Sequence, residues 1–406
     1  MPQLTSIDDL LEQMVAHGAS DLHVTVGSPP AFRVRGHIVR AEQYEPLTAD
    51  DTRSLLYRVL TSEQQKIFEQ RRQLDFAYSM PGLARFRVNV YYQREAVSAA
   101  FRLIPQEIKT LEELRLPQIL HSLATYPRGL VLVTGPTGSG KSTTLAAIID
   151  EINRTRAEHI LTVEDPIEFV HRHKKCIVNQ REIGPDASSF GEALKAALCQ
   201  DPDVILVGEM RDLETISTAL TAAETGHLVF GTLHTQSAPS TIDRIIDVFA
   251  PEQQEQVRIM IANSLQAVVT QSLLPTADGV GRVAALEILL PDDAVRNLIR
   301  QAKIEQVYSV MQTKTSGGMQ TMEQALADLV LRQVVNVDDA LSRSSRPDQL
   351  TGLLERQGYD VEGALATLDA PKPPPQQPAA ALSPQPAPVL PPRPQEVVTG
   401  LRMAGS

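Results

Sequence analysis

A glycine-rich segment, Gly135-Pro-Thr-Gly-Ser-Gly-Lys-Ser142, places the strongest constraint on what this chain can fold into. It matches the pattern G-x4-G-K-[ST] without a gap, follows the apolar run 129–134 and precedes a helical apolar stripe over 145–152. Glycines let backbone N–H groups turn onto phosphate oxygens, and the N-terminus of the helix adds the positive end of its dipole. The motif therefore predicts a strand, a phosphate-binding loop and a helix within an α/β domain.

The residue types in this loop indicate that it binds ATP together with Mg²⁺. Lys141 can reach the β- and γ-phosphates, and the Ser142 hydroxyl can bind Mg²⁺. The alternative, a glycine-rich turn that matches by chance, does not account for the strand before the loop and the helix after it. The predicted nucleotide-binding residues are Gly135, Pro136, Thr137, Gly138, Ser139, Gly140, Lys141, Ser142 and Thr143.

The pattern of the chain changes on either side of a short linker. The residues before 104 read as a small α+β unit, in which 84–92 alternates apolar with basic or polar side chains. Residues 104–117 contain two prolines and several charges, and we interpret them as a hinge between domains. From 126 to 290, short apolar runs alternate with helical stretches, which favours a mainly parallel sheet flanked by helices. Residues 292–345 read as helical.

Composition excludes several classes of protein. The 406-residue chain has no apolar run of about 18 residues, so no transmembrane helix is expected. Acidic residues near the start argue against a secretory signal, and two cysteines are too few for a disulfide framework. The net charge of −11 argues against a general nucleic-acid coat but leaves room for a local basic channel. A cytoplasmic protein fits these features.

Proline is concentrated near the C-terminal end of the sequence. Of its 28 prolines, 11 lie between 371 and 394. Such a segment has little apolar side chain to bury and cannot offset the entropy of ordering, so we expect a disordered proline-rich tail. Its PxxP motifs could bind an aromatic-lined groove of a partner protein. The alternative is a tail that has no partner.

Acidic residues follow two of the predicted strands. The run 160–163 leads into Glu164, Asp165 and Glu168, and the run 204–207 leads into Glu209. The C-terminal edge of a parallel sheet is where ligands bind, so a carboxylate here could orient an attacking water. The alternatives are a solvated acidic loop for the first group, and a helix cap or surface acid for Glu209.

Two histidines bracket another predicted strand over 228–230. His227 opens this strand, and His234 follows it. Both could sense a γ-phosphate, but histidines also commonly pack in a core or cap a helix. The residues alone leave both readings open.

Taken together, these motifs resemble the secretion-type ATPases that power type IV pili and type II secretion. GPTGSGKST is similar to the family's Walker A motif, ILTVEDPIEF to its Asp box, DVILVGEMRDLET to its Walker B motif and GHLVFGTLHT to its His box. The order and spacing of the motifs also agree over residues 5–345. The resemblance implies a PAS-like α+β domain over 1–104, a linker over 105–117 and a RecA-like P-loop ATPase domain with a helical end over 118–345. A short helical extension over 346–370 and the proline-rich tail over 371–406 would follow.

The resemblance also assigns roles to single residues. It implies that Glu168 is the catalytic base, and that Glu209 helps to hold Mg²⁺ and water together with Ser142. His227 and His234 match the two family histidines. Arg87 and Arg102 match the arginines that the N-terminal domain lends to the nucleotide, and the alternative for this pair is a solvated basic strand face.

Within the family, the sequence favours the PilT-like retraction branch. Residues 294–301, AVRNLIRQ, resemble its signature AIRNLIRE and depart from it at Val295 and Gln301. Extension and secretion motors usually carry a longer N-terminal region and a tetracysteine zinc insert, for which this chain has too few cysteines. The alternative for 294–301 is an ordinary amphipathic helix that buries Val295, Leu298 and Ile299.

The predicted function is therefore that of a hexameric ATPase that hydrolyses ATP to drive pilus retraction and twitching motility. The implied partners are an inner-membrane platform protein and other pilus ATPases, with the ring peripheral to the membrane at its cytoplasmic face. The alternative is an extension or type II secretion motor. Less favoured alternatives are a nucleic-acid translocase that uses the basic run 171–175, and a scaffold whose functional part is the tail.

Overall fold

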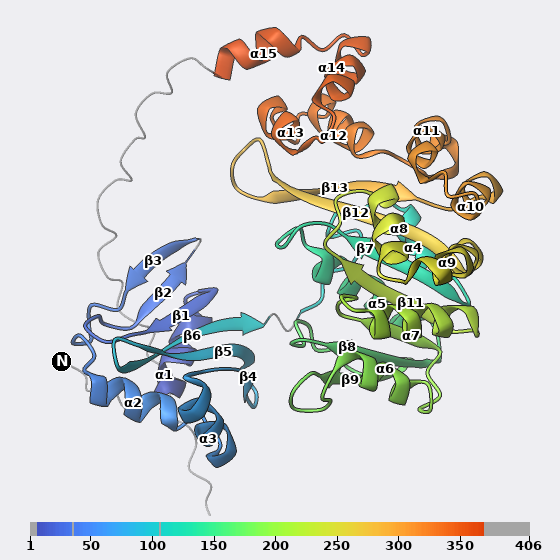
Figure 1. The fold of residues 1–406 in the computed structure, drawn as a ribbon. Coiled ribbons are helices and arrows are strands. Elements are labelled where there is room, and N and C mark those ends of the chain that lie inside the picture. The colour runs from blue at the N-terminus through green and yellow to red at the C-terminus, as the bar shows by residue number, and fades with distance from the viewer. Residues whose placement is uncertain (1–5, 35, 105–106, 369–406) are drawn as a thin grey trace, which may run out of the picture. The chain divides into compact units, whose positions relative to one another are not determined.

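The computed structural model describes residues 6–34, 36–104 and 107–368 (Figure 1). The described residues up to Val361 form one compact unit, and the described residues from Glu362 to Leu368 belong to a second. The proline-rich tail predicted over 371–406 lies outside the described residues, and the domain boundaries inferred from the sequence stay predictions. None of the described helices is long and apolar enough to cross a membrane.

The N-terminal region is a six-stranded antiparallel sheet with three helices, in the order β3-β2-β1-β6-β5-β4. Its core joins one face of the sheet to the helices: Leu10 and Met14 from the first helix and Phe86 and Val88 from the fifth strand are all buried. The period of two in 84–92 therefore corresponds to a strand with one buried face. The elements are α1 (Ile7–Ala16), β1 (Asp21–Val24), β2 (Ala31–Val34), β3 (His37–Arg40), α2 (Ala49–Tyr57), α3 (Ser62–Arg71), β4 (Gln73–Met80), β5 (Ala84–Gln93) and β6 (Ala96–Ile104).

Residues 129–289 form a seven-stranded sheet in the order β13-β12-β7-β11-β10-β8-β9. All neighbouring strands are parallel except the hairpin of the last two. The strands are β7 (Gly129–Thr134), β8 (His159–Glu164), β9 (Ile177–Glu182), β10 (Val204–Val207), β11 (Leu228–Leu233), β12 (Leu265–Pro275) and β13 (Arg282–Leu289). The predicted alternation of apolar runs and helices thus yields a mainly parallel sheet, and the mixed α/β fold class is confirmed.

Helices cover both faces of this sheet, as Figure 1 shows. Leu130 and Leu132 of β7 point into one apolar core, whereas Val131 and Val133 point into another. Because both faces are buried, the central strands read as unbroken apolar runs. The helices between residues 119 and 264 are α4 (Ile119–Leu123), α5 (Lys141–Thr155), α6 (Phe190–Ala197), α7 (Leu213–Glu224), α8 (Ala238–Asp247) and α9 (Pro251–Ser264).

Residues 293–343 are largely helical, as the sequence predicts for 292–345. In α10 (Asp293–Arg300), which contains most of the AVRNLIRQ segment, Val295 and Ile299 are fully buried and Leu298 is partly buried. Leu350 and Leu354 of α14 (Pro347–Arg356) are also fully buried, and this helix contacts α12. The remaining helices are α11 (Val307–Thr313), α12 (Met322–Leu331), α13 (Val337–Arg343) and α15 (Val361–Leu368).

Candidate nucleotide-binding site

The phosphate-binding loop connects β7 to α5, in the strand–loop–helix context that its sequence predicts. Gly135, Gly138 and Gly140 all adopt positive φ, at 134°, 81° and 88°, a region that L side chains rarely adopt. Gly140 precedes the first turn of α5, so the loop ends at a helix N-terminus whose free N–H groups can bind an anion.

The Lys141 side chain folds back onto this loop. Its ammonium donates to the backbone carbonyl of Gly135 at 2.9 Å and to that of Pro136 at 3.2 Å. Burial lowers the pKa of Lys141, while the carboxylates of Glu209 and Glu168 act in the opposite direction. A cation that bonds only to neutral carbonyls gains from exchanging them for phosphate oxygens.

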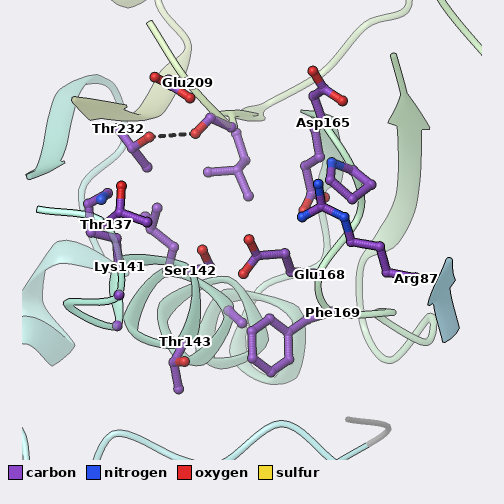
Figure 2. A pocket seen from close by; sticks show the side chains of 18 of the residues that line it. Arg87, Thr137, Lys141, Ser142, Thr143, Asp165, Glu168, Phe169, Glu209 and Thr232 are labelled. Atoms are coloured by element: carbon purple, nitrogen blue, oxygen red, sulfur yellow. Dashed lines mark hydrogen bonds between the residues drawn. The ribbon is translucent and has the colours of Figure 1, made fainter. Parts of the chain in front are cut away.

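One pocket collects most of the predicted site residues (Figure 2). It is lined by the loop and by the acidic residues that follow β8 and β10, because these strands are parallel and end at the same sheet edge. The predicted residues that line it are Arg87, Arg102, Thr137, Gly138, Gly140, Lys141, Ser142, Thr143, Glu168, Glu209 and His234. Gly135, Pro136, Ser139 and His227 do not line it.

His227 lies at the other end of its strand from His234. It precedes β11, and its ring contacts the carbonyl of Ala222 at 3.0 Å. Since β11 runs parallel to β10, the amino end of the strand is the edge opposite the loop. The structure therefore brings His234 to the pocket and leaves His227 away from it, and the catalytic role of His227 stays a prediction.

Glu209 follows β10 and is held by two basic side chains. Its carboxylate lies 3.0 Å from Nε2 of His234 and also forms an ion pair with Arg211. Burial by itself would raise the pKa of Glu209, but Arg211 and His234 outweigh it and hold that pKa below its ordinary value. Glu209 is therefore a stable anion that faces the phosphate-binding loop. Sequence reasoning did not single out Arg211.

Glu168 and Glu164 have different environments although they belong to one motif. Glu168 is exposed and lines the pocket, in the loop after β8 that begins with the cis peptide Asp165–Pro166. Glu164 is the last residue of β8 and accepts hydrogen bonds from Thr162 and Gln180 at 2.6 and 3.1 Å. Burial raises the pKa of Glu164 despite these bonds. Glu168 is thus the freer carboxylate for chemistry on a bound nucleotide.

The two predicted arginines face each other on neighbouring strands. Arg87 of β5 is the register partner of Arg102 of β6, and both line the pocket. Nε of Arg102 lies 2.9 Å from Oδ1 of Asp21, and Nε of Arg87 lies 3.9 Å from Oδ1 of Asp75. The Arg87–Asp75 pair is exposed on both sides and is worth little energy, so the Arg87 guanidinium can move to a phosphate at small cost. Arg102 is itself largely exposed, but its partner Asp21 is buried and pairs also with Arg33 at 3.7 Å.

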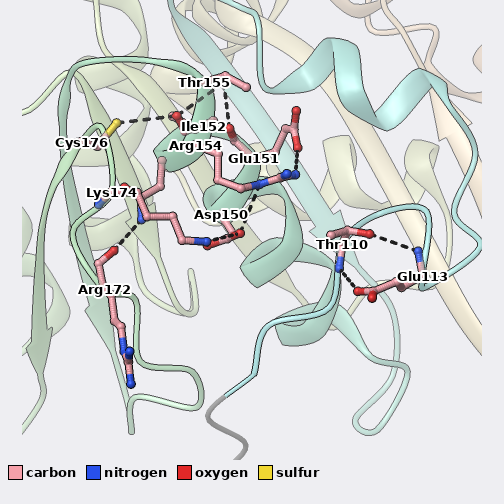
Figure 3. Close-up of polar contacts among 11 residues, drawn as sticks. Thr110, Glu113, Asp150, Glu151, Ile152, Arg154, Thr155, Arg172, Lys174 and Cys176 are labelled. Atoms are coloured by element: carbon pink, nitrogen blue, oxygen red, sulfur yellow. Dashed lines mark hydrogen bonds and ion pairs between the residues drawn. The ribbon is translucent and has the colours of Figure 1, made fainter.

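Part of the basic run 171–175 contacts the rest of the protein (Figure 3). Nζ of Lys174 lies 2.6 Å from Oδ1 of Asp150 on α5, and the Asn153 side chain bonds the backbone of Arg172 and Lys174. His171 is 7% exposed, and burial lowers its pKa to about 4. These contacts fasten the segment after the acidic loop to α5, whereas Arg172, His173 and Lys175 are exposed.

Comparison with known proteins identifies the family. The model of the type II/IV secretion system protein family matches residues 2–343. The chain is 52% identical over 342 residues to the type IV pilus retraction ATPase PilT of Pseudomonas aeruginosa, covering 84% of this chain and 99% of that protein. It is also 52% identical over 322 residues to a twitching motility protein of Neisseria gonorrhoeae, covering 79% and 86% of the two chains.

A likeness to solved structures agrees with this result. The crystal structure of the pilus retraction motor PilT with bound ADP superposes with a TM-score of 0.82 at 50% identity, covering 86% of this chain and all of that one. The ATPase DotB of Legionella pneumophila superposes with a TM-score of 0.71 at 30% identity, covering 84% and 96%. The resemblance inferred from the motifs is confirmed: the chain belongs to the type II/IV secretion system protein family.

Proposed function

We propose that this chain is an ATP-hydrolysing motor that drives the retraction of type IV pili. The observation that carries the proposal is the pocket, which combines a phosphate-binding loop with Glu168, Glu209 and two arginines. The 52% identity to a type IV pilus retraction ATPase over 84% of the chain supports the direction of the motor. Extension or type II secretion is the alternative. It has weaker support, since the type II secretion ATPase E of Vibrio cholerae is 35% identical over 286 residues.

The loop binds the phosphates of ATP. Lys141 leaves the carbonyls of Gly135 and Pro136 and pairs with the β- and γ-phosphates, while loop N–H groups and the N-terminus of α5 bind the remaining oxygens. Mg²⁺ takes oxygen ligands and commonly combines one or two protein groups with phosphates and waters. The Ser142 hydroxyl and the Glu209 carboxylate line one pocket and fit that donor set.

Hydrolysis needs a base for the attacking water and compensation of the charge on the γ-phosphate. Glu168 orients the water and accepts its proton, because it is an exposed carboxylate in the pocket with no hydrogen bond among the described contacts of its side chain. Arg87 and Arg102 neutralise the γ-phosphate, and arginines in this role contribute roughly 10³–10⁵-fold to the rate in other NTPases. His234 pairs with Glu209 at 3.0 Å and lines the same pocket.

Loss of the γ-phosphate removes the contacts of both arginines. A change in population requires contacts that differ between two states, and these contacts depend on the nucleotide. The motor acts as a homohexamer at the cytoplasmic face of the inner membrane, where it moves a platform protein so that pilin subunits leave the filament base. Other pilus ATPases are further candidate partners.

The test combines a gene deletion with a single substitution. Cells without the gene should carry excess pili and fail to twitch, and a gene for Glu168→Gln should not restore twitching, because the amide cannot accept the proton. The purified Glu168→Gln protein should bind ATP and hydrolyse it at least about 100-fold more slowly, the usual contribution of a general base. Glu192→Gln, an exposed carboxylate on α6 outside the pocket, is the matched control.

Four outcomes would contradict the proposal. Bald cells after deletion would indicate an extension motor, and normal pili would exclude both directions. Hydrolysis at the normal rate by Glu168→Gln would remove this residue from the mechanism. Stimulation of hydrolysis by DNA or RNA would favour a nucleic-acid translocase.

A further inference from the structure

We infer that Gln271 is a positioning residue that holds the phosphate-binding loop in its binding shape. Gln271 belongs to β12, which lies beside β7 in the sheet with Thr270 in register with Thr134. This register places Gln271 next to the point where β7 ends and the loop begins. The side chain is buried, with 3% of its surface exposed, so it faces the loop and not the solvent.

The side-chain amide of Gln271 joins the loop to the helix that follows. Its Nε2 donates to the backbone carbonyl of Ser139 at 2.7 Å, and its Oε1 accepts from Oγ1 of Thr144 at 2.8 Å. Ser139 lies within the loop, and Thr144 lies in the first turn of α5. A single planar group therefore joins the C-terminal end of the loop to the first turn of the helix.

The bond to Ser139 also determines the direction of a neighbouring N–H group. The peptide unit between Ser139 and Gly140 is planar and trans, so its carbonyl and its N–H point in opposite directions. Because Gln271 binds the carbonyl, the N–H of Gly140 is turned away from β12. Gly140 itself lines the pocket. The contact thus aligns a donor of the loop before any phosphate arrives.

The glycines of the loop show how closely β12 approaches it. A Cβ atom added to Gly135 would lie 2.3 Å from the backbone oxygen of Gln271, and one added to Gly140 would lie 2.8 Å from its Nε2. A Cβ atom added to Gly138 would meet nothing within 4 Å. The close contact is therefore specific to the two ends of the loop, which are the ends that Gln271 touches.

Replacing this amide by an apolar group would weaken nucleotide binding. The Ser139 carbonyl and the Thr144 hydroxyl would lose their buried partners, and the loop would have to be ordered by the nucleotide itself. Each lost hydrogen bond costs about a factor of ten in affinity when the free energy is drawn from binding. This inference rests on the proposed role of residues 135–143 as the phosphate-binding loop.

The experiment measures the dissociation constant of ADP and the kcat and KM of ATP hydrolysis for the full chain. Gln271→Met, which keeps the length of the side chain and removes both bonds, should raise the dissociation constant and KM about 10- to 100-fold and change kcat less. Thr144→Val, which removes one hydrogen bond, should raise the dissociation constant of ADP and the KM of ATP hydrolysis about tenfold. The matched control is Thr270→Val, which breaks the buried 2.9 Å contact of Thr270 with Thr134 between the same strands without touching the loop carbonyl.

Each result either supports the inference or overturns it. Unchanged ADP binding by Gln271→Met would overturn it, and so would an equal loss in Thr270→Val, since general damage to the sheet would then explain both. If Gln271→Met does not fold, Thr144→Val decides the question, and normal binding there overturns the inference. Lys141→Ala distinguishes a failure of the proposed nucleotide site from a failure of the role of Gln271. Normal ADP binding by Lys141→Ala would refute the loop as the nucleotide site. If Lys141→Ala loses ADP binding while Gln271→Met binds normally, only the role of Gln271 is refuted.

Discussion

The buried carboxyl group of Glu287 should make the stability of this protein depend on pH. Glu287 lies on β13 with 2% of its surface exposed, and it accepts hydrogen bonds from the backbone N–H of Ala238 at 2.6 Å and of Met322 at 3.4 Å. These are the first residues of α8 and α12, so one carboxyl group serves two helix N-termini. Burial raises its pKa to about 7, although the two N–H groups act to lower it.

The direction of the effect follows from comparing the folded and unfolded chains. Below pH 4.5 the group is protonated in both, and above pH 7 it is ionised in both. Between these values only the unfolded chain gives up the proton, so the folded state loses stability as pH rises. At about 1.4 kcal/mol for each pKa unit, the raised pKa corresponds to a loss of about 3 kcal/mol across this window.

Glu287→Gln removes this titration and should flatten the dependence. Melting temperatures of both proteins would be measured from pH 5 to pH 8 without nucleotide. About 3 kcal/mol corresponds to roughly 4 °C for a compact unit that ends at Val361, so the wild-type melting temperature should fall by that much relative to the variant. Glu355→Gln, an exposed carboxyl group on α14, changes the charge equally and serves as the control. Parallel curves for wild type and Glu287→Gln would refute the reasoning.

Two further predictions concern packing. Leu354→Ala should destabilise the fold by about 2–5 kcal/mol, since the side chain is fully buried, and a melting temperature equal to that of the exposed Gln357→Ala would contradict the packing of α14. Gly135→Ala should abolish ADP binding because its Cβ atom would meet a backbone oxygen at 2.3 Å, whereas Gly138→Ala, with open space around its Cβ atom, should cost only about 1 kcal/mol of backbone strain. Equal binding losses in the two alanine variants, measured by calorimetry, would count against the steric argument.

Many of the residues that line the candidate pocket could be predicted, because their signals are local. The strand, glycines and lysine of 129–141 are consecutive, and the acidic residues Glu168 and Glu209 directly follow apolar strands that are themselves easy to recognise. Parallel strands end at one sheet edge, so these local signals are enough to bring the residues together. Glu168 and His234, which the sequence placed after such strands, both line the pocket.

Other parts of the site could not be predicted from the sequence. Residues 265–275 were not recognised as a strand, because Thr270 and Gln271 interrupt the apolar run and no alternation replaces it. Arg211 gave no signal either, since an exposed arginine after an acidic strand end is common on protein surfaces. Its role becomes visible only through its ion pair with Glu209.

The sequence by itself determined the chemistry of this protein. The glycines and the lysine of 135–142 are enough to specify a candidate phosphate-binding loop, since neighbours in the chain cannot separate. Only the tertiary structure decided which distant groups complete that site. The order of strands places β12 beside β7, and this brings Gln271 to Ser139 across 132 residues of chain. The same sheet brings Glu287 to the N-termini of two helices. Such contacts depend on which strands pair, and neither residue nor its neighbours in the sequence indicate that pairing.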